Sequence, residues 1–187
     1  MPSFPSTQAH SERRSLKTIL LLRHAKSSWD QPHLPDPLRP LAPRGREAAP
    51  LIGAYMARNG MVPNRVLCSP ARRATETWEL VSEQMDESIL VEIRDELYHA
   101  SSSCLLSILR ELPDTEKAVL FVGHNPAFEE LASVLATSGP VEALAELSRK
   151  FPTGALAVFD FSVSTWSEVR EGTGSLRDFV RPRTLKY

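Results

Sequence analysis

Short runs of apolar residues alternate along the chain with segments in which apolar residues recur every three or four positions. The runs cover residues 18–22, 65–68, 90–93 and 118–122. Apolar runs of this length are typical of strands buried on both faces of a parallel sheet. Between and after these runs, apolar residues recur at helical spacing. This pattern predicts amphipathic helices at residues 48–56, 74–85, 105–112 and 128–135.

This alternation predicts a single-domain α/β fold with a mostly parallel sheet and helices on both faces. After residue 151 the pattern changes, and short strands are predicted at residues 156–161, 168–170 and 176–180. They would add antiparallel edge strands near the C-terminus. Residues 1–15 are polar and aperiodic and predict a flexible tail, which leaves residues 16–187 as the domain.

Five prolines between residues 32 and 43 exclude regular structure there and predict a stiff loop that could line a site. The helix after this loop should end at Asn59-Gly60. Pro50 must lie in the first turn of that helix or kink it.

Composition narrows the possible partners. The chain has 22 basic and 23 acidic residues and a formal net charge of -1, so no nucleic-acid or membrane partner is indicated. The apolar run at residues 19–22 is too short for a signal peptide or a membrane span. Cys68 and Cys104 are expected to be reduced thiols in core segments, which suits a cytoplasmic location.

Basic side chains follow three of the predicted strands. Arg23-His24 comes directly after the first strand, Arg72-Arg73 shortly after the second, and His124 after the strand at 118–122. In open α/β sheets, ligands bind beyond the carboxyl ends of the strands. Two histidines and three arginines are therefore expected at one edge of the sheet.

This group of residues favours phosphate over the alternatives. A single histidine at a strand end is more often a structural hydrogen-bonding group, but arginine is costly to bury without a partner. Arg72 and Arg73 would stand in the first turn of a helix, where the free N–H groups favour anions. A metal site is disfavoured because no third ligand has suitable spacing and the arginines would repel a cation. Neither a metal nor another cofactor is expected.

Three segments carry a resemblance to a known family. They are LRHAKS at residues 22–27, SPARRATET at 69–77 and VGHNP at 122–126. In order and spacing they resemble the histidine phosphatase superfamily, and more closely its SixA-like phosphohistidine phosphatase group. The resemblance extends over about residues 17–183 and implies a phosphoglycerate mutase-like fold.

The resemblance implies that His24 is the nucleophile and that Arg23, Arg73 and His124 bind the phosphoryl oxygens. Arg73 matches the family arginine better than Arg72, which is expected to be exposed or one layer behind the site. Neutral imidazole can attack phosphorus when a hydrogen bond to its other nitrogen fixes the tautomer.

Other roles stay open at this point. The family pattern places a general acid after the third strand, where Glu96 is the first candidate and Asp95 the second, unless both are solvated loop carboxylates. Thr153 could donate to the phosphate or belong to a plain turn. Ala25 stands where the wider superfamily usually has glycine, and Arg39 is a secondary candidate.

These observations together predict a metal-independent phosphatase that works through a phosphohistidine intermediate on His24. The expected substrates are phosphorylated proteins, especially phosphohistidine proteins. One alternative is a phosphatase of small phosphate esters. A second is a non-catalytic phospho-binding module, which would need an altered nucleophile, whereas His24 is intact.

Overall fold

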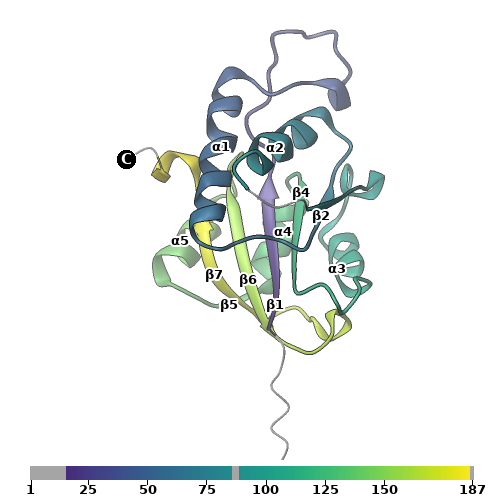
Figure 1. Cartoon of the computed structure of the whole chain (residues 1–187), viewed down its shortest axis with the longest axis vertical. Helices are drawn as coiled ribbons and strands as arrows, with labels where there is room; N and C mark the ends of the chain where they lie inside the picture. Colours follow the sequence, from purple (N-terminus) through teal and green to yellow (C-terminus); the bar gives the residue numbers. More distant parts are fainter. Residues whose placement is uncertain (1–15, 86–88, 186–187) are drawn as a thin grey trace, which may run out of the picture.

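The structure is a computed structural model that describes residues 16–85 and 89–185. A seven-stranded sheet in the order β3-β2-β4-β1-β6-β7-β5 runs through the molecule (Figure 1). Its strands are β1 (Leu16–Arg23), β2 (Arg65–Cys68), β3 (Leu90–Ile93), β4 (Ala118–Gly123), β5 (Ala136–Ser138), β6 (Leu156–Ser162) and β7 (Gly174–Val180). The tail predicted at residues 1–15 lies outside the described residues.

The sheet is mostly parallel, as predicted. β4 pairs in parallel with β1 and β2, β2 with β3, and β5 with β7. Only β6 runs the other way, antiparallel to both β1 and β7. The late strands β6 and β7 are internal and not at the edge, because the short strand β5 pairs with the outer side of β7.

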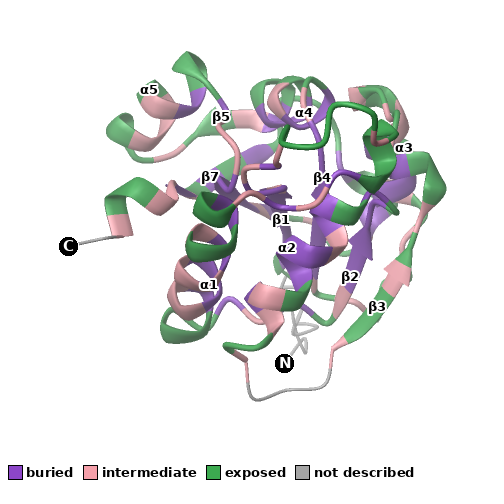
Figure 2. Cartoon of the chain, turned by 90° about the horizontal axis from the view of Figure 1, so that it is seen from above, coloured by how far each residue is buried: buried purple, intermediate pink, exposed green. Residues whose placement is uncertain are grey.

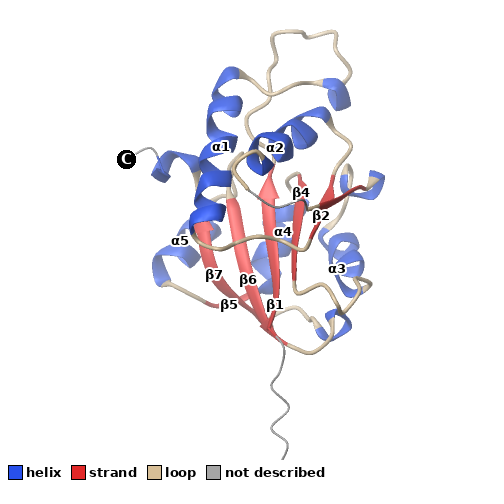
Figure 3. Ribbon diagram, viewed as in Figure 1, coloured by secondary structure: helices blue, strands red, loops and turns tan. Residues whose placement is uncertain are grey.

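Helices cover the two faces of the sheet (Figure 3), and the described residues form five α-helices. They are α1 (Pro43–Arg58), α2 (Arg72–Ser82), α3 (Ser102–Arg110), α4 (Ala127–Leu135) and α5 (Val141–Arg149). Apolar residues of α1 and α2 pack in one core cluster, and those of α3, α4 and α5 pack in the other. The helices therefore lie on both faces, which confirms the predicted layers.

The central strand β1 explains why its sequence is apolar without interruption. Ile19 and Leu21 pack in the cluster beneath α3 to α5, whereas Leu20 and Leu22 pack in the cluster beneath α1 and α2. Successive side chains of a strand point to opposite faces, so a strand covered on both faces needs apolar residues at every position. Figure 2 shows this buried centre surrounded by exposed helix surfaces.

Three details differ from the predictions. α1 begins at Pro43, so Pro50 lies inside the helix and not in its first turn. The strand predicted at residues 168–170 is absent: Trp166–Glu168 forms a 3-10 turn, η3, closed by a capping box between Thr165 and Glu168. Helix α5 was not predicted, because Leu147 is its only buried residue.

The carboxyl ends of β1, β2 and β4 lie side by side, because these strands are parallel neighbours. This edge of the sheet carries the histidines and arginines that the sequence singles out. In the described part of the chain, no helix has the length and apolar character that crossing a bilayer requires.

Candidate active site

His24 follows the last residue of β1 and is fixed through its backbone. Its N–H donates to the Gly123 carbonyl at the end of β4, and its carbonyl accepts from the Gly154 N–H, both at 3.0 Å. The side chain is 8% exposed. The end of β4 and the turn before β6 thus hold the backbone of His24 in place.

The imidazole of His24 has a defined tautomer. Nδ1 lies 2.7 Å from the carbonyl oxygen of Ala25. A carbonyl oxygen can only accept, so Nδ1 carries the hydrogen and Nε2 keeps its lone pair when the ring is neutral. Burial lowers the pKa of His24 to about 4, and the charges of Arg73 and Arg23 act in the same direction. At neutral pH the ring is therefore neutral, and the lone pair of Nε2 is available.

Ala25, the departure from the usual glycine, fits this arrangement. It is fully buried, and its N–H donates to Oγ1 of Thr77 in α2 at 3.0 Å. Its carbonyl is the acceptor for His24. Since neither contact needs backbone angles that only glycine adopts, alanine is compatible with the site.

The second histidine, His124, lies beside the first. The two ring centroids are 5.0 Å apart. Ser69, at the end of β2, accepts from the Ala71 N–H at 3.3 Å, and its oxygen lies 2.8 Å from Nε2 of His124. Nδ1 of His124 is a buried atom without a partner among the described residues. A Ser69 hydroxyl that donates to Nε2 leaves the hydrogen of His124 on Nδ1, from which it can be donated to an anion.

Burial lowers the pKa of His124 to about 3, and the neighbouring His24 and Arg73 add to the shift. Both rings are therefore neutral at pH 7. Positive charge in the site comes from arginines, whereas each histidine offers one lone pair or one N–H.

Two arginines flank the histidines. Arg23, the last residue of β1, donates from Nη1 to the Phe151 carbonyl at 2.7 Å, and its buried Nε has no partner in the described structure. Arg73, in the first turn of α2, is 8% exposed. Arg72 turns away, as expected, and pairs with Glu76 at 2.8 Å. A partly buried guanidinium, that of Arg23, and a buried one, that of Arg73, thus lie beside the histidines.

The proline-rich loop brings in a residue that the sequence analysis missed. Asp36 opens the 3-10 turn η1 (Asp36–Leu38), and its Oδ2 accepts from Arg73 Nη2 at 3.0 Å and from the Tyr98 hydroxyl at 2.6 Å. Its Oδ1 accepts from Arg39 Nη1 at 2.8 Å. The hydrogen bond from Tyr98, followed by those from the arginines, lowers the pKa of Asp36 to about 2.

Arg39, a secondary candidate, is part of the same network. It is 7% exposed and also donates to Oγ of Ser27 at 2.9 Å. Its guanidinium lies 3.2 Å from the ring centroid of Trp29. A proline-rich segment followed by an arginine was the only sign in the sequence that this loop contacts the site.

The acid candidates lie further out. Glu96 is in the 3-10 turn η2 (Asp95–Leu97), and its carboxylate is bound by Arg94 at 3.2 and 3.3 Å. These hydrogen bonds lower the pKa of Glu96, so its carboxylate is ionised, and both of its oxygens accept from Arg94. Asp95 is exposed, and its side chain forms no hydrogen bond or ion pair with either histidine. Neither carboxylate is brought into the cluster around His24 and His124.

Thr153 lies at the border of the site. It precedes Gly154, whose positive φ of 75° lets its N–H reach the carbonyls of Arg23 and His24. The Thr153 side chain lines a separate basic pocket next to Lys26. In the described residues, no group of three or more His, Cys, Asp or Glu side chains could hold a metal ion.

Comparisons with known proteins agree with this geometry. The family model of the histidine phosphatase superfamily (branch 1) matches residues 19–101. The Rv1276c protein of Mycobacterium tuberculosis is 37% identical over 164 residues, which cover 87% of this chain and 100% of that protein.

Two solved structures of SixA proteins are also similar to this chain. The SixA protein of Agrobacterium tumefaciens, assigned as a phosphohistidine phosphatase, is 30% identical, with a TM-score of 0.74 over 89% of this chain and 98% of the other. A SixA protein from Nakamurella multipartitia with the same assignment is 28% identical, with a TM-score of 0.75 over 90% and 97%. The chain belongs to the histidine phosphatase superfamily, in its SixA-like group, and is a phosphatase.

Proposed function

We propose that this phosphatase transfers the phosphoryl group of its substrate to Nε2 of His24 and then to water. The observation that carries the proposal is the hydrogen bond from Nδ1 of His24 to the Ala25 carbonyl. It leaves a neutral, buried nitrogen with a lone pair beside two arginines. The Nε2–P bond forms as the bond from phosphorus to the leaving group breaks, and water then cleaves the Nε2–P bond.

The residues around His24 suit the charge of the transferred group. Phosphoryl transfer depends mainly on positioning and on stabilising charge on the equatorial oxygens. Arg23 and Arg73 would bind those oxygens through their guanidinium groups, and Nδ1–H of His124 would donate to one of them. Since these arginines would repel a cation, the proposed reaction uses no metal ion.

The leaving group decides how much acid catalysis is needed. Glu96, the proton donor suggested by the family pattern, is ionised and bound to Arg94 in this structure. A role for Glu96 would need its release from Arg94. The imidazole of phosphohistidine leaves more readily than an alkoxide, so its transfer depends less on a general acid.

We propose phosphohistidine proteins as the substrates. The two SixA relatives with 28% and 30% identity are assigned as phosphohistidine phosphatases. Between β3 and α3 the chain forms only the short turn η2, with no inserted helices to cover the site. An open site admits a protein side chain. The free thiols of Cys68 and Cys104 suit a reducing cytoplasm as the compartment.

The mechanism is tested by trapping the intermediate. Enzyme mixed with a 32P-labelled phosphohistidine protein and quenched during turnover should carry label that is labile in acid and stable in base. His24→Ala should lose both label and turnover, whereas His33→Ala, which removes an exposed histidine in the proline-rich loop, should keep both. Unchanged turnover in His24→Ala would refute the mechanism, and loss of activity on adding a chelator would refute its metal independence.

The substrate class is tested separately. Rates are compared on a phosphohistidine protein and on a panel of small phosphate esters. The proposal expects the higher kcat/KM on the phosphohistidine protein. A large preference for a small ester would assign the enzyme to metabolite hydrolysis instead.

A further inference from the structure

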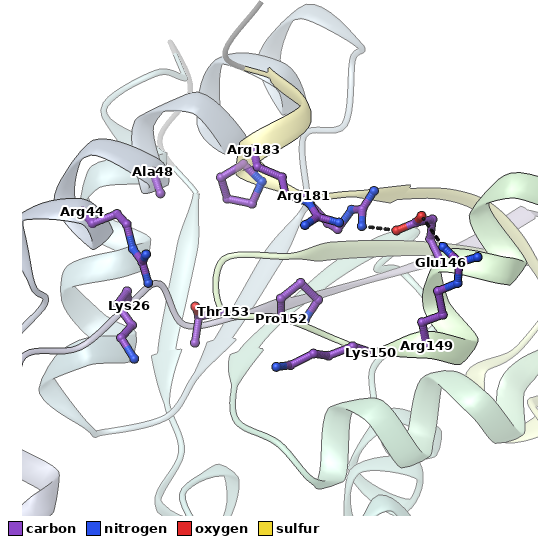
Figure 4. Close-up of a pocket in the computed structure, with 11 residues that line it drawn as sticks. Lys26, Arg44, Ala48, Glu146, Arg149, Lys150, Pro152, Thr153, Arg181 and Arg183 are labelled. Atoms are coloured by element: carbon purple, nitrogen blue, oxygen red, sulfur yellow. Dashed lines mark hydrogen bonds and ion pairs between the residues drawn. The ribbon is translucent and has the colours of Figure 1, made fainter.

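A basic pocket of about 470 Å³ lies next to the active site (Figure 4). It is formed where the N-terminal end of α1, the C-terminal end of α5 and the turn η4 (Pro182–Leu185) meet. Pro152 and Thr153 lie between these segments in Figure 4. The volume is typical of a ligand site.

The pocket carries far more positive than negative charge. Six basic side chains line it, and the one acidic side chain, Glu146, is paired with Arg149 and Arg181. The remaining four have no hydrogen bond or ion pair from their side chains to any described residue; they are Lys26, Arg44, Lys150 and Arg183. Four cations around one cavity, without partners in the described structure, favour an anionic ligand.

The placement of these cations indicates a ligand with several separate charges. Lys26 and Arg44 lie on one side of the cavity and Lys150 on the other, and Arg183 is at the top of the view in Figure 4. They come from four different segments of the chain. A single phosphate, which fits within one group of converging donors, would leave most of them unpaired.

The residues that line the pocket are not typical of a nucleotide-binding site. It contains no aromatic side chain, and its uncharged members are Ala48, Pro152, Thr153 and Pro182. Nucleotide bases are usually bound by stacking on aromatic rings or in apolar slots. The pocket offers positive charge at several separate points and no surface on which a base could stack. These features suit the carboxylates of an extended acidic peptide.

The pocket borders the catalytic segment directly. Lys26 stands two positions after His24, and Thr153 precedes Gly154, whose N–H donates to the His24 carbonyl at 3.0 Å. A peptide whose phosphorylated residue is at His24 would therefore place neighbouring residues at this pocket.

We propose that this basic pocket binds acidic side chains that flank the phosphorylated residue of a protein substrate. The proposal rests on the proposed function, because it assumes that the substrate is a protein. It makes the enzyme selective for phosphorylated sites in acidic surroundings. Such electrostatic selection weakens with salt, since exposed charges are screened.

The test uses two phosphohistidine peptides that differ only in having Asp and Glu or Ser and Gln beside the phosphorylated residue. In the double variant Arg44→Gln/Arg183→Gln, kcat/KM for the acidic peptide should fall about five- to tenfold, and kcat/KM for the neutral peptide less than twofold. The matched control Arg58→Gln/Lys117→Gln removes the same charge from exposed residues outside the pocket and should change neither value. Equal losses on both peptides, or no loss on either, would overturn the proposal.

A binding measurement separates this proposal from the proposed function. Calorimetry with His24→Ala and the unphosphorylated peptides needs no turnover, and the acidic peptide should bind more tightly at low salt. Loss of that preference in the double variant supports the pocket even if phosphohistidine is not hydrolysed. Binding of inorganic tripolyphosphate that depends on Arg44 and Arg183, without any preference between the peptides, would assign the pocket to small polyanions and overturn the proposal.

Discussion

Asp36 and Arg73 are 37 positions apart in sequence and form an ion pair, with Oδ2 of Asp36 3.0 Å from Nη2 of Arg73. The Asp36 carbonyl also accepts from Nη1 of Arg73 at 2.8 Å. Two contacts from one residue fix the plane of the guanidinium, which the proposed mechanism sets against the phosphoryl group. Asp36 is therefore a positioning residue for Arg73.

Replacing Asp36 should misplace Arg73 without removing it. We expect Asp36→Ala to lower kcat/KM by about tenfold to a hundredfold, because small displacements of positioning groups have effects of this size. Asp36→Asn, which can still accept a hydrogen bond, should lose less. Steady-state kinetics give the values, and thermal unfolding checks the fold. Faster turnover in either variant would mean that the carboxylate competes with the phosphoryl group.

The Asp36 contact also marks the limit of prediction from sequence. The sequence could place His24, Arg23, Arg73 and His124 at one edge of the sheet. Each stands at or after the end of a strand with a visible apolar run, and parallel neighbours end at the same edge. Asp36 lies in a loop without periodicity, so no pattern predicts its long-range partner.

The same reasoning applies to the fold. β5 has three residues and α5 has a single buried residue, Leu147, so neither leaves a hydrophobic pattern. Both are fixed by tertiary contacts: β5 by pairing with β7, and α5 by packing beside that strand. The central strands and their helices could be predicted because burial on two faces requires a continuous apolar run.

We expect Ser69 to affect the rate of the reaction by fixing the tautomer of His124. The Ser69 hydroxyl lies 2.8 Å from Nε2 of His124, and its removal leaves both ring nitrogens free to carry the hydrogen. We expect Ser69→Ala to lower kcat/KM about tenfold, in the range typical of lost orienting hydrogen bonds. Nitrogen NMR of the imidazole should show hydrogen on Nδ1 in the native protein and a mixture in the variant. A lower rate with unchanged tautomer would contradict this role.

Glu96→Gln tests the proton donor. The carboxylate is exposed and bound to Arg94, so we expect less than a twofold change in kcat/KM on a phosphohistidine peptide. An alkyl phosphate, whose leaving group needs a proton, is the sensitive comparison in the same assay. A tenfold loss confined to the alkyl phosphate would establish Glu96 as the acid, with Arg94 releasing it during turnover.

Gly45 sets how closely α1 approaches the catalytic segment. A Cβ at this position would lie 2.2 Å from the Lys26 carbonyl oxygen, two residues beyond His24. Although alanine normally favours a helix, Gly45→Ala should destabilise the protein by about 2–3 kcal/mol and lower kcat/KM. Gly60→Ala is the control: its φ is 64° but its Cβ would meet nothing within 4 Å. Backbone strain alone should cost about 1 kcal/mol there and leave kcat/KM unchanged.

The buried, neutral state of His24 predicts how stability depends on pH. Its pKa is about 4 in the native protein and about 6.5 in an unfolded chain. Between these values the unfolded chain binds a proton that the native protein does not, so the free energy of unfolding rises with pH from about 4 to 6.5. Below this window the penalty from His24 is complete and on the order of 3 kcal/mol.

Urea unfolding of the native protein and of His24→Gln at several pH values measures this contribution. Glutamine does not titrate, so the stability of the native protein relative to the variant should fall as the pH is lowered from 7 to 4. His33→Gln, at an exposed position, should leave that dependence as it is in the native protein. If the difference between native protein and His24→Gln does not change with pH, His24 is not held neutral by burial, and a protonated ring would have no lone pair for phosphorus.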